Sequence, residues 1–563
     1  MALKTRKGNF NRLKLFIIIM KIWKDINWTK VNLMVFDLQR KIFKASVNKS
    51  IGKVRYYQKT LVNSHEAKLI AVRKVTQDNR GKKIPGVDGK LVLNHLERIK
   101  LAYDLRLDGS ADPIRRVFIP KGNTKRPLGI PTIKDRAKQA LVKLALEPEW
   151  EAKFDPNSFG FRPGYSQADA KWIVTRQIQG APKYFLDADI KSCFDNISHD
   201  YLLKKLNTTK MFENQIKSWL KAGVTDFTFS NGTEISENRA GTPQGGVLSP
   251  LLANIVLNGM EQLLKDKFNR NVRLIRYADD FVVFSKREKI IVESKKLLQD
   301  FLKPIGLDFS NEKTRIGHTL IGPNPGLDFL GFNFRNHKVS VHHGVKNTKG
   351  IKQNFKQITE PSRKSIKTHK EEIVALLRIY KNAPLSSVIE ALSSKIRGWT
   401  YYYSLSQSTK TFTVLDGWLW KRLWRWSVKR FKGAKRAKKR CFSVSGWKFG
   451  FIDEITKKKW VLKRYDQVKV RKYVKIKKGA SIFDGQLEYF SKRLALHHPL
   501  FKRLRGTLVK QNRRCAYCEV LFSPDDIIEL HHVRDKNGRW LKEFQFVHGH
   551  CHDKIHGEKK SNR

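Results

Sequence analysis

The sequence has few acidic residues, few cysteines and no long apolar run. It contains 51 Asp and Glu against 113 Lys and Arg, which gives a formal net charge of +62 at pH 7 over 563 residues. A charge of this size indicates a polyanionic partner, first of all a nucleic acid. A membrane surface is the competing partner, but no apolar run approaches the roughly 18 residues that a spanning helix needs. We therefore expect no contact with a membrane.

The scarcity of cysteine and the short apolar run near the N-terminus limit the cellular compartments that the sequence suggests. Five cysteines are too few and too dispersed for a disulfide scaffold, which favours a reducing compartment. The apolar run at residues 15–20 has no small-residue cleavage site after it, so we interpret it as a buried helix segment rather than a signal peptide. A transit peptide is the less favoured alternative. Hydrophobic residues make up 40% of the chain, enough for real cores, and its length predicts about four domains.

Two short strand-like runs flank the sequence Tyr277-Ala278-Asp279-Asp280, and they predict a hairpin with two aspartates at its turn. Neighbouring carboxylates repel each other unless a cation compensates, and Mg²⁺ is commonly held by one or two carboxylates plus substrate phosphates. A solvated turn is the alternative for an isolated pair. A third aspartate, Asp189, ends another apolar run, and three such carboxylates could hold two metal ions for nucleotidyl transfer.

Three motifs follow one another in the chain. The first is Asp189-x-x-x-x-Phe194-Asp195, the second begins Thr242-Pro243-Gln244-Gly245-Gly246, and the third is the Tyr-Ala-Asp-Asp turn. In order and spacing they resemble motifs A, B and C of the group II intron reverse transcriptases. The resemblance implies an α+β multidomain chain: right-hand polymerase fingers and palm with an antiparallel sheet backed by helices, then a helical thumb. It also implies that Asp189, Asp279 and Asp280 are catalytic and bind two Mg²⁺ ions.

The same resemblance implies roles around the incoming nucleotide. Lys121 and Arg126, in a basic turn between two strand-like runs, would bind the triphosphate. Phe194 would exclude a ribose hydroxyl, and Gln244 would lie beside the nucleotide and the template base. Lys313, in a segment similar to motif D, would be the general acid for pyrophosphate. Without the resemblance, Phe194 reads as a core residue and the cations as solvated surface charges.

The resemblance divides the chain into five parts. These are 1–80, a helical RNA-binding N-terminal extension; 81–345, fingers and palm; 346–428, the maturase or thumb domain (domain X); 429–510, a basic DNA-binding region; and 511–563, an HNH endonuclease with a zinc site.

Four other segments have nucleic-acid features. The aromatic and basic runs at 396–403 and 415–426 suit an RNA-binding surface on a helical core. Residues 429–440 hold eight basic residues and no acidic one, so alone they predict a charged linker or arm, continued by Trp447 and the basic strand-like run 460–478. Residues 158–166 have the glycines and aromatics of a loop laid against nucleic acid, with a purely structural turn as the alternative.

The C-terminal part contains a Cys-x-x-Cys pair and a distal cysteine, which indicate a structural Zn²⁺ site. We predict Cys515, Cys518, His548 and Cys551 as its ligands, with His550 as an alternate to His548.

The histidines carry a separate signal, because His-His followed by His-x-x-x-His resembles an HNH nuclease with a ββα-metal fold. In that fold His532 would be the general base, and His531, His552 and His556 would hold a catalytic divalent ion. The Asn that names the motif falls on Glu543, which leaves nuclease activity open. One structural knuckle formed by all these residues is the alternative.

Together the motifs predict an intron-encoded enzyme that combines reverse transcription, maturase activity and nicking of target DNA. The alternative is a splicing-only RNA-binding maturase with little polymerase or nuclease activity. The implied partners are group II intron RNA, target DNA and dNTPs, and a homodimer stays open. The lysine excess over arginine and the resemblance to chloroplast-like intron enzymes favour a chloroplast over a mitochondrion, with bacterial cytoplasm as the alternative.

Overall fold

The computed structural model describes residues 23, 25–121, 124–225, 235–236, 240–346, 350–444, 446, 448–497, 505–534 and 540–556. The apolar run at 15–20 and Trp447 lie outside these residues, and so does the side chain of Lys121. Among the described helices, none is both long and apolar enough to cross a membrane.

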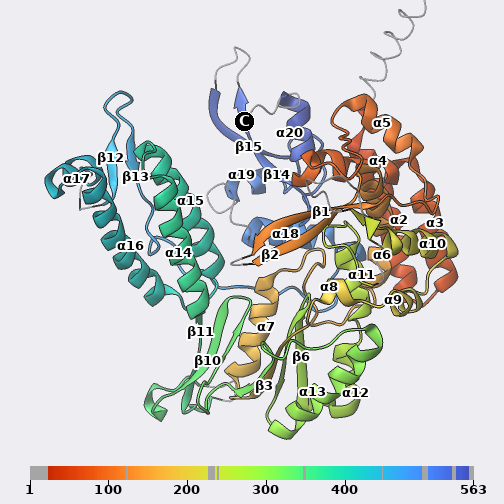
Figure 1. Ribbon diagram of the computed structural model, residues 1–563, viewed down its shortest axis with the longest axis horizontal. Helices are drawn as coiled ribbons and strands as arrows, with labels where there is room; N and C mark the ends of the chain where they lie inside the picture. The colour runs from red at the N-terminus through yellow and green to blue at the C-terminus, as the bar shows by residue number, and fades with distance from the viewer. Residues whose placement is uncertain are drawn as a thin grey trace, which may run out of the picture.

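The N-terminal helices are α2 (Trp28–Val47), α3 (Ile51–Asn63), α4 (His65–Arg73) and α5 (His95–Asp104), and one long helix of the next segment is α6 (Ile133–Glu151). Three of the four N-terminal helices, α2, α3 and α4, pack against α6, and α5 packs on α4 (Figure 1). In α2 the residues Val31, Val35 and Ile42 are buried, as an amphipathic stripe at helical spacing requires. This face belongs to a core that continues into α6.

The central sheet has the strand order β6-β7-β3-β8. Its strands are β3 (Tyr184–Asp189), β6 (Val272–Tyr277), β7 (Asp280–Ser285) and β8 (Arg315–His318). Alternation along the strands gives each face its own core. Helices on one face include α11 (Ser249–Val256), α12 (Met260–Phe268) and α13 (Glu288–Leu302), and α7 (Gln167–Gln179) covers part of the other. Shorter helices α8 (Cys193–Asn196), α9 (His199–Leu206) and α10 (Lys210–Lys221) connect β3 to the next motif.

A second sheet has the strand order β2-β1-β4-β5. The antiparallel pair β1 (Ile114–Lys121) and β2 (Thr124–Ile130) forms the predicted basic hairpin, with Lys121 opposite Thr124 at its end. The short strands β4 (Val224–Thr225) and β5 (Ile235–Ser236) extend the sheet.

Beyond the central sheet the chain becomes helical, as predicted. A three-stranded sheet of β9 (Leu327–Phe329), β10 (Phe332–Lys338) and β11 (Phe355–Pro361) leads to the helices α14 (Arg363–Ile379), α15 (Leu385–Tyr403) and α16 (Thr409–Arg430). These helices stand apart from the N-terminal helices, on the left of Figure 1. Phe332 links the three-stranded sheet to α15, because its ring stacks on Tyr402 and meets Tyr403 edge-on.

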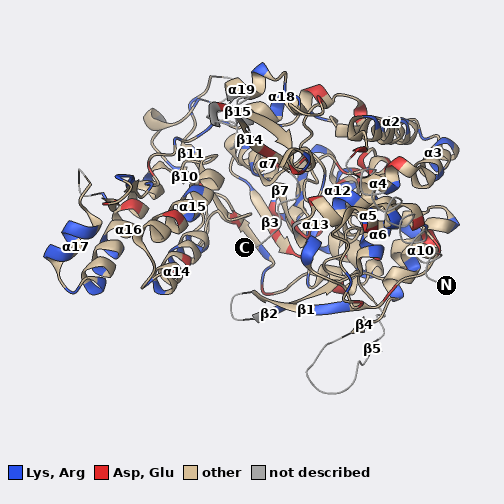
Figure 2. Ribbon diagram, turned by 90° about the horizontal axis from the view of Figure 1, so that it is seen from above, with Lys and Arg blue, Asp and Glu red and all other residues tan. Residues whose placement is uncertain are grey.

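The basic stretch 429–440 is neither a linker nor an extended arm. It completes α16 and forms α17 (Ala434–Cys441), which buries Ala437 and Cys441 while its lysines and arginines face outward (Figure 2). Alanine and cysteine four residues apart give this short helix an apolar face, which the count of charges alone did not reveal. The run 460–478 is also not one strand, since only its first two residues belong to a strand, β13 (Lys459–Val461), which pairs with β12 (Gly450–Ile452).

The chain then returns from the thumb side to the N-terminal helices. It passes through α18 (Leu487–His497) and α19 (Arg505–Lys510) and ends in the hairpin β14 (Ile528–Arg534) and β15 (Trp540–His548), followed by α20 (Gly549–His556). This last part has the predicted β-β-α order.

Candidate functional site

The turn between β6 and β7 presents the two adjacent aspartates. The hairpin is the predicted one, but Tyr277 pairs with Asp280, so the connection consists of Ala278 and Asp279 alone and Asp280 is the first residue of β7 rather than part of the turn. Ala278 has φ +58, a left-handed conformation that costs a residue with a Cβ about 1–2 kcal/mol. Such strain persists only where the surroundings impose it, and it is concentrated at functional turns.

The support of this turn comes from residues 157–160. The Arg276 amide donates to the Asn157 carbonyl and the Phe159 amide donates to the Arg276 carbonyl, both at 2.9 Å, so this segment runs along β6 like an extra strand. A Cβ on Gly160 would lie 2.9 Å from the Ala278 Cα. The first part of the predicted nucleic-acid loop is therefore a structural support, and Phe161, 49% exposed, begins its accessible part.

Two further residues hold the turn, and sequence reasoning missed them. The fully buried Arg276 donates to the Asn254 side-chain oxygen at 2.8 Å and to the Ala278 carbonyl at 3.0 Å. Asn254 in turn donates to the Gly160 carbonyl at 2.7 Å. The available signal was one polar residue, Asn254, inside the apolar run of the second motif.

The three predicted aspartates come together at one edge of the central sheet. Asp189 lies opposite Asp280 across β3 and β7, and Asp279 is at the adjacent turn. Desolvation and the charges of Asp279 and Asp189 raise the pKa of Asp280 to about 7, and desolvation also raises the pKa of Asp279. The Lys313 ammonium donates to the Asp189 carboxylate. Crowded carboxylate oxygens with a single close lysine fit the hard-oxygen preference of Mg²⁺.

Gln244 connects the second motif to the basic hairpin. Its side-chain oxygen accepts from Arg126 Nε at 2.7 Å, and its amide nitrogen donates to Asp195 Oδ1 at 3.0 Å. Its backbone carbonyl accepts from the Gly129 amide at 2.8 Å. Gly245 has φ +131, and a Cβ there would lie 2.5 Å from the Gly129 carbonyl oxygen, so only glycine allows this close approach.

Phe194 is partly a core residue, and the rest of its ring is accessible. Its ring is half-buried against the main core and also lies 6.3 Å, edge-on, from the exposed Phe161. Burial raises the pKa of the neighbouring Cys193 thiol to about 12, so this cysteine is uncharged at neutral pH.

An open groove of about 590 Å³ separates the aspartates from the helical part of the chain. Asp189, Asp280 and Lys313 line one wall, and the residues of the other wall include Lys364, Thr368 and Trp399. The groove makes the carboxylates accessible from the side of α14 and α15.

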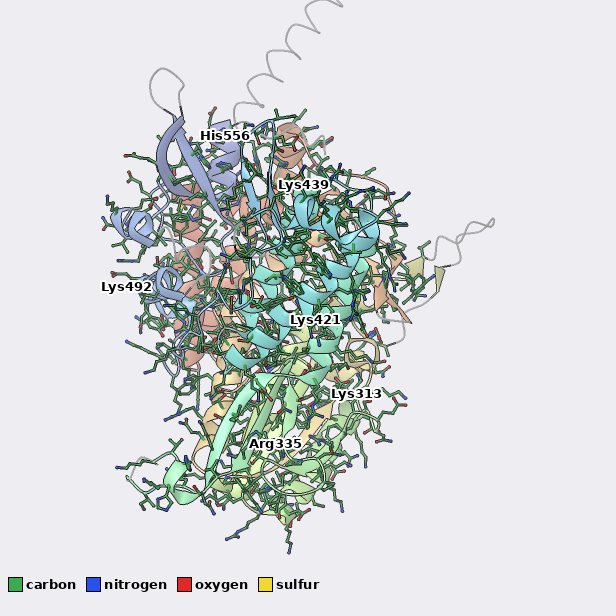
Figure 3. All side chains as sticks on the ribbon, turned by 90° about the vertical axis from the view of Figure 1, so that its left-hand side faces the viewer. Lys313, Arg335, Lys421, Lys439, Lys492 and His556 are labelled. Carbon is green, nitrogen blue, oxygen red and sulfur yellow. The ribbon has the colours of Figure 1, made fainter. Side chains whose placement is uncertain are left out.

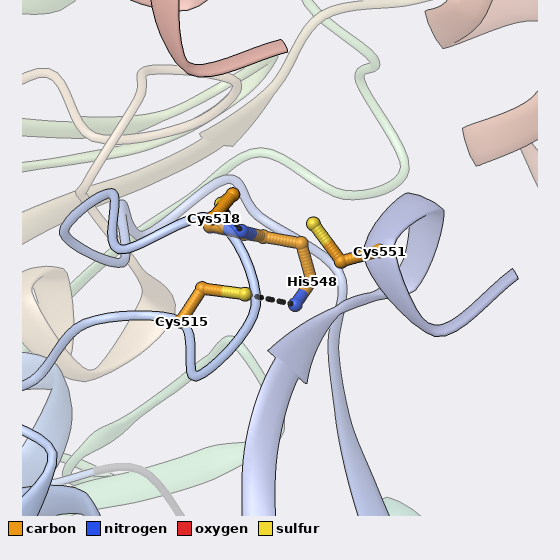
Figure 4. A group of neighbouring side chains, drawn as sticks. All are labelled: Cys515, Cys518, His548 and Cys551. Atoms are coloured by element: carbon orange, nitrogen blue, oxygen red, sulfur yellow. Dashed lines mark hydrogen bonds between the residues drawn. The ribbon is translucent and has the colours of Figure 1, made fainter. Parts of the chain in front are cut away.

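The predicted zinc ligands form one cluster (Figure 4). The ligand atoms of Cys515, Cys518, His548 and Cys551 all lie within 4.8 Å of one another. His548 Nδ1 is 3.3 Å from the Cys518 sulfur, and its Nε2 is 3.3 Å from Asp526 Oδ2. A carboxylate on the far nitrogen of a ligand histidine is the usual outer contact of a zinc site, so this donor set fits Zn²⁺.

Hydrogen bonds within this cluster shift the pKa values of its groups in opposite directions. Bonds from Cys518 and Cys551 hold the pKa of Cys515 far below its usual range. Burial alone would lower the pKa of His548, but the bonds with Asp526 and the cysteines raise it to about 11. His550, the alternate ligand, is outside the cluster, and its ring lies 6.1 Å from that of Trp28.

A second cluster lies on the other side of α20. The ligand atoms of His531, His552 and His556 are also within 4.8 Å of one another, and His552 Nδ1 is 2.7 Å from Glu529 Oε2. The neighbouring His532 is exposed, with its ring 4.5 Å from that of Phe544. Strand alternation places Glu543 on the opposite face from Phe544, so it does not take the position beside His532. The histidines and cysteines thus form two groups rather than one knuckle.

The region of the Cys515, Cys518, His548 and Cys551 cluster contacts the N-terminal helical part, which nothing in the sequence indicated. Thr29 Oγ1 donates to the Cys518 carbonyl at 2.9 Å, and Lys554 Nζ donates to the Ile26 carbonyl at 3.0 Å. Gln77 Nε2 adds a bond of 3.1 Å to Asp553.

Comparison with known protein families gives three matches in chain order. Residues 23–105 match the N-terminal domain of reverse transcriptase, 119–334 match reverse transcriptase (RNA-dependent DNA polymerase), and 366–442 match the group II intron maturase-specific domain.

Curated relatives agree with these matches. The chain is 33% identical to Protein YkfC of Escherichia coli, over 47% of this chain and 79% of the relative. It is 29% identical to Maturase-like protein 1 of Euglena gracilis, over 69% of this chain and 79% of the relative. It is 31% identical to the group II intron-encoded protein LtrA of Lactococcus lactis, over 42% of this chain and 50% of the relative. A solved telomerase from Candida albicans aligns over 59% of this chain and 61% of its own, with 16% identity and a TM-score of only 0.34.

Proposed function

Because the chain belongs to the family of group II intron-encoded reverse transcriptases and maturases, we propose that it polymerises DNA on an RNA template at Asp189, Asp279 and Asp280. The observation that supports this most is the register of β3 and β7, which brings the carboxylates of Asp189 and Asp280 together beside the Asp279 turn. Two Mg²⁺ ions bound there would activate the primer 3′-hydroxyl and neutralise the triphosphate.

The protein groups around the carboxylates have complementary tasks in this proposal. Arg126 approaches from the basic hairpin and places a guanidinium where a triphosphate would lie. Lys121, at the end of the same hairpin, is assigned to the triphosphate on the resemblance alone. Phe194 presents a ring edge at the sugar and selects deoxynucleotides. Lys313, released from Asp189 when metal binds, donates a proton to the leaving pyrophosphate.

Primer extension tests this proposal. Purified natural chain is supplied with an RNA template, a DNA primer, dNTPs and Mg²⁺, and is compared with Asp279→Ala. Extension should fall by a factor of at least roughly 10³, in line with the loss of a group that acts directly in the reaction. The matched control is Asp300→Ala, which removes an exposed aspartate on α13 and should leave the rate unchanged. A folded, RNA-binding natural chain that does not extend would instead favour the splicing-only maturase.

We further propose that the helical part binds intron RNA and that the chain divides at 80, 345, 428 and 510 as the sequence suggested. Lys421 on α16 and Lys439 on α17 lie on one side of this part (Figure 3), and Trp420 and Trp424 stack with a 3° interplanar angle next to them. Cations for phosphates and stacked aromatics suit RNA and, in 429–510, target DNA.

For the C-terminal module we propose a structural Zn²⁺ on Cys515, Cys518, His548 and Cys551, and a DNA-nicking site on the second cluster. His531, His552 and His556 would hold the divalent ion there, and His532 would be the base that takes a proton from water. The β-β-α order and the separation of the two clusters support this. A nicking assay on supercoiled DNA, with His532→Ala as the variant, tests it.

The compartment stays a proposal as well. The curated relatives come from bacteria and from eukaryotes. We propose an organelle, with a plastid first because of the lysine excess, and fractionation of the source cells separates it from bacterial cytoplasm.

A further inference from the structure

One carboxylate near the three aspartates has no role in the proposed reaction. Asp195 follows Phe194 on α8, and its carboxylate accepts from the Gln244 amide nitrogen at 3.0 Å and 3.2 Å. The other end of the same amide accepts from Arg126 Nε at 2.7 Å. Three elements that are distant in the sequence thus form one row of side chains, Asp195–Gln244–Arg126.

The polarity of this row allows only one orientation of the amide. A guanidinium can only donate hydrogen bonds and an ionised carboxylate can only accept them, whereas the glutamine amide has one end of each kind. If the Gln244 amide turned over, its NH₂ group would meet Arg126 and its oxygen would meet Asp195, so both bonds would be lost. Arg126 and Asp195 therefore require the same orientation of the amide, and the carboxylate of Asp195 fixes the end that Arg126 does not touch.

The backbones that carry this row are held in place independently. The Thr242 amide donates to the Phe194 carbonyl at 2.6 Å, and Gly241, with φ +88, lies where a Cβ would be 2.6 Å from the Asp195 carbonyl oxygen. Gln244 is fixed through its own carbonyl to Gly129. With the backbones fixed, only the side-chain torsions of Gln244 and Arg126 depend on the hydrogen bonds of the row.

We propose that Asp195 is a positioning residue for the incoming nucleotide, acting through Gln244 on Arg126. By holding the amide in one orientation, it keeps the Arg126 guanidinium on the side of the nucleotide site, where the charge of Arg126 also acts on Asp279. The inference rests on the proposed polymerase function, because it gives Arg126 and Gln244 their place beside the nucleotide.

Steady-state primer extension with varied dNTP concentration tests the proposal with four variants. Asp195→Ala should raise the KM for dNTP roughly 10- to 100-fold, the effect of losing one hydrogen bond to a charged group, with a much smaller change in kcat. Asp195→Asn keeps an accepting oxygen and should stay close to the natural chain. Circular dichroism and RNA binding show that each variant is folded.

Exchanging the hydrogen-bonding polarity of Asp195 and Gln244 gives a sharper test. Gln244→Glu should be strongly impaired, because it opposes two carboxylates while leaving the shape unchanged. The double variant Asp195→Asn with Gln244→Glu restores a donor facing an acceptor, with Arg126 still donating to the new carboxylate, and should recover most of the lost dNTP affinity. A merely structural Asp195 would give no such rescue.

The outcomes separate the two claims. Extension by the natural chain with an unchanged KM in Asp195→Ala, or a double variant no better than Gln244→Glu, would overturn the positioning role alone. Absence of extension by the folded natural chain would overturn the polymerase proposal and this inference with it.

Discussion

Replacing Gly160 with alanine should displace the turn that carries Asp279, which we propose to be catalytic, without removing any functional group. The new Cβ would overlap the Ala278 backbone nitrogen and would lie 2.9 Å from both the Ala278 Cα and the Tyr277 carbonyl carbon, whereas ordinary contact begins at 3.4 Å. These are backbone atoms, so they cannot rotate away, and the turn or residues 157–160 must move by roughly 1 Å or more to restore ordinary contact. Gly160 does not have a positive φ, so the effect is purely one of contact.

The size of the effect follows from the position of the turn. Overpacking of this kind typically costs about 1–3 kcal/mol of stability. A misplacement of about 1 Å can reduce a catalysed rate by roughly 10²-fold, so we expect kcat to fall roughly 10- to 100-fold. The assay is single-turnover primer extension with saturating dNTP and Mg²⁺, with circular dichroism to show that the fold is retained.

A second glycine provides the matched control. Gly417 lies within α16, and a Cβ there would meet nothing within 4 Å. Gly417→Ala should therefore keep full activity and stabilise the helix by about 0.5–1 kcal/mol. Full activity of Gly160→Ala would refute the view that residues 157–160 set the position of the aspartates.

Three further predictions concern the metal sites. The pKa of Asp280 is raised to about 7, and a metal ion binds the carboxylate form, so the Mg²⁺ concentration for half-maximal extension should fall as pH rises from 6 to 8. The fall should be at most roughly tenfold, because this carboxylate is also partly exposed. An Mg²⁺ requirement that does not change with pH would contradict this prediction. The variant Cys551→Ser should lose bound zinc, which elemental analysis measures. It should also exchange amide hydrogens faster in the first turns of α2, because Thr29 bonds to the carbonyl of the proposed zinc ligand Cys518. Unchanged exchange in a zinc-free variant would show that this contact does not stabilise α2. His556→Ala should abolish nicking and leave zinc content and primer extension unchanged, whereas loss of zinc would mean that the two clusters are one site.

The raised pKa of Asp280 also affects stability when no metal is bound. A carboxyl whose folded-state pKa lies above its unfolded value stabilises the fold only while it stays protonated, so this contribution is lost as pH rises through about 7. Bound cations would reverse the trend.

The sequence by itself determined the local elements and the family. The hairpin at Asp279 and Asp280, the basic hairpin, the helical part and the Cys-x-x-Cys pair could be predicted, because each depends on turn residues, periodicity or ligand spacing within a few positions. The helix formed by residues 434–441 was missed, because two small buried residues among many charges leave little pattern.

Only the tertiary structure decided which distant residues meet. His548 and His550 are two residues apart and chemically alike, and packing alone puts one beside the cysteines and the other against Trp28. Gly160 below the catalytic turn and Asp195 beside Gln244 became visible only when their segments were placed together. The same holds for Thr29 and Cys518, 489 positions apart, because such contacts are set by how whole elements pack, and no local preference of the chain encodes them.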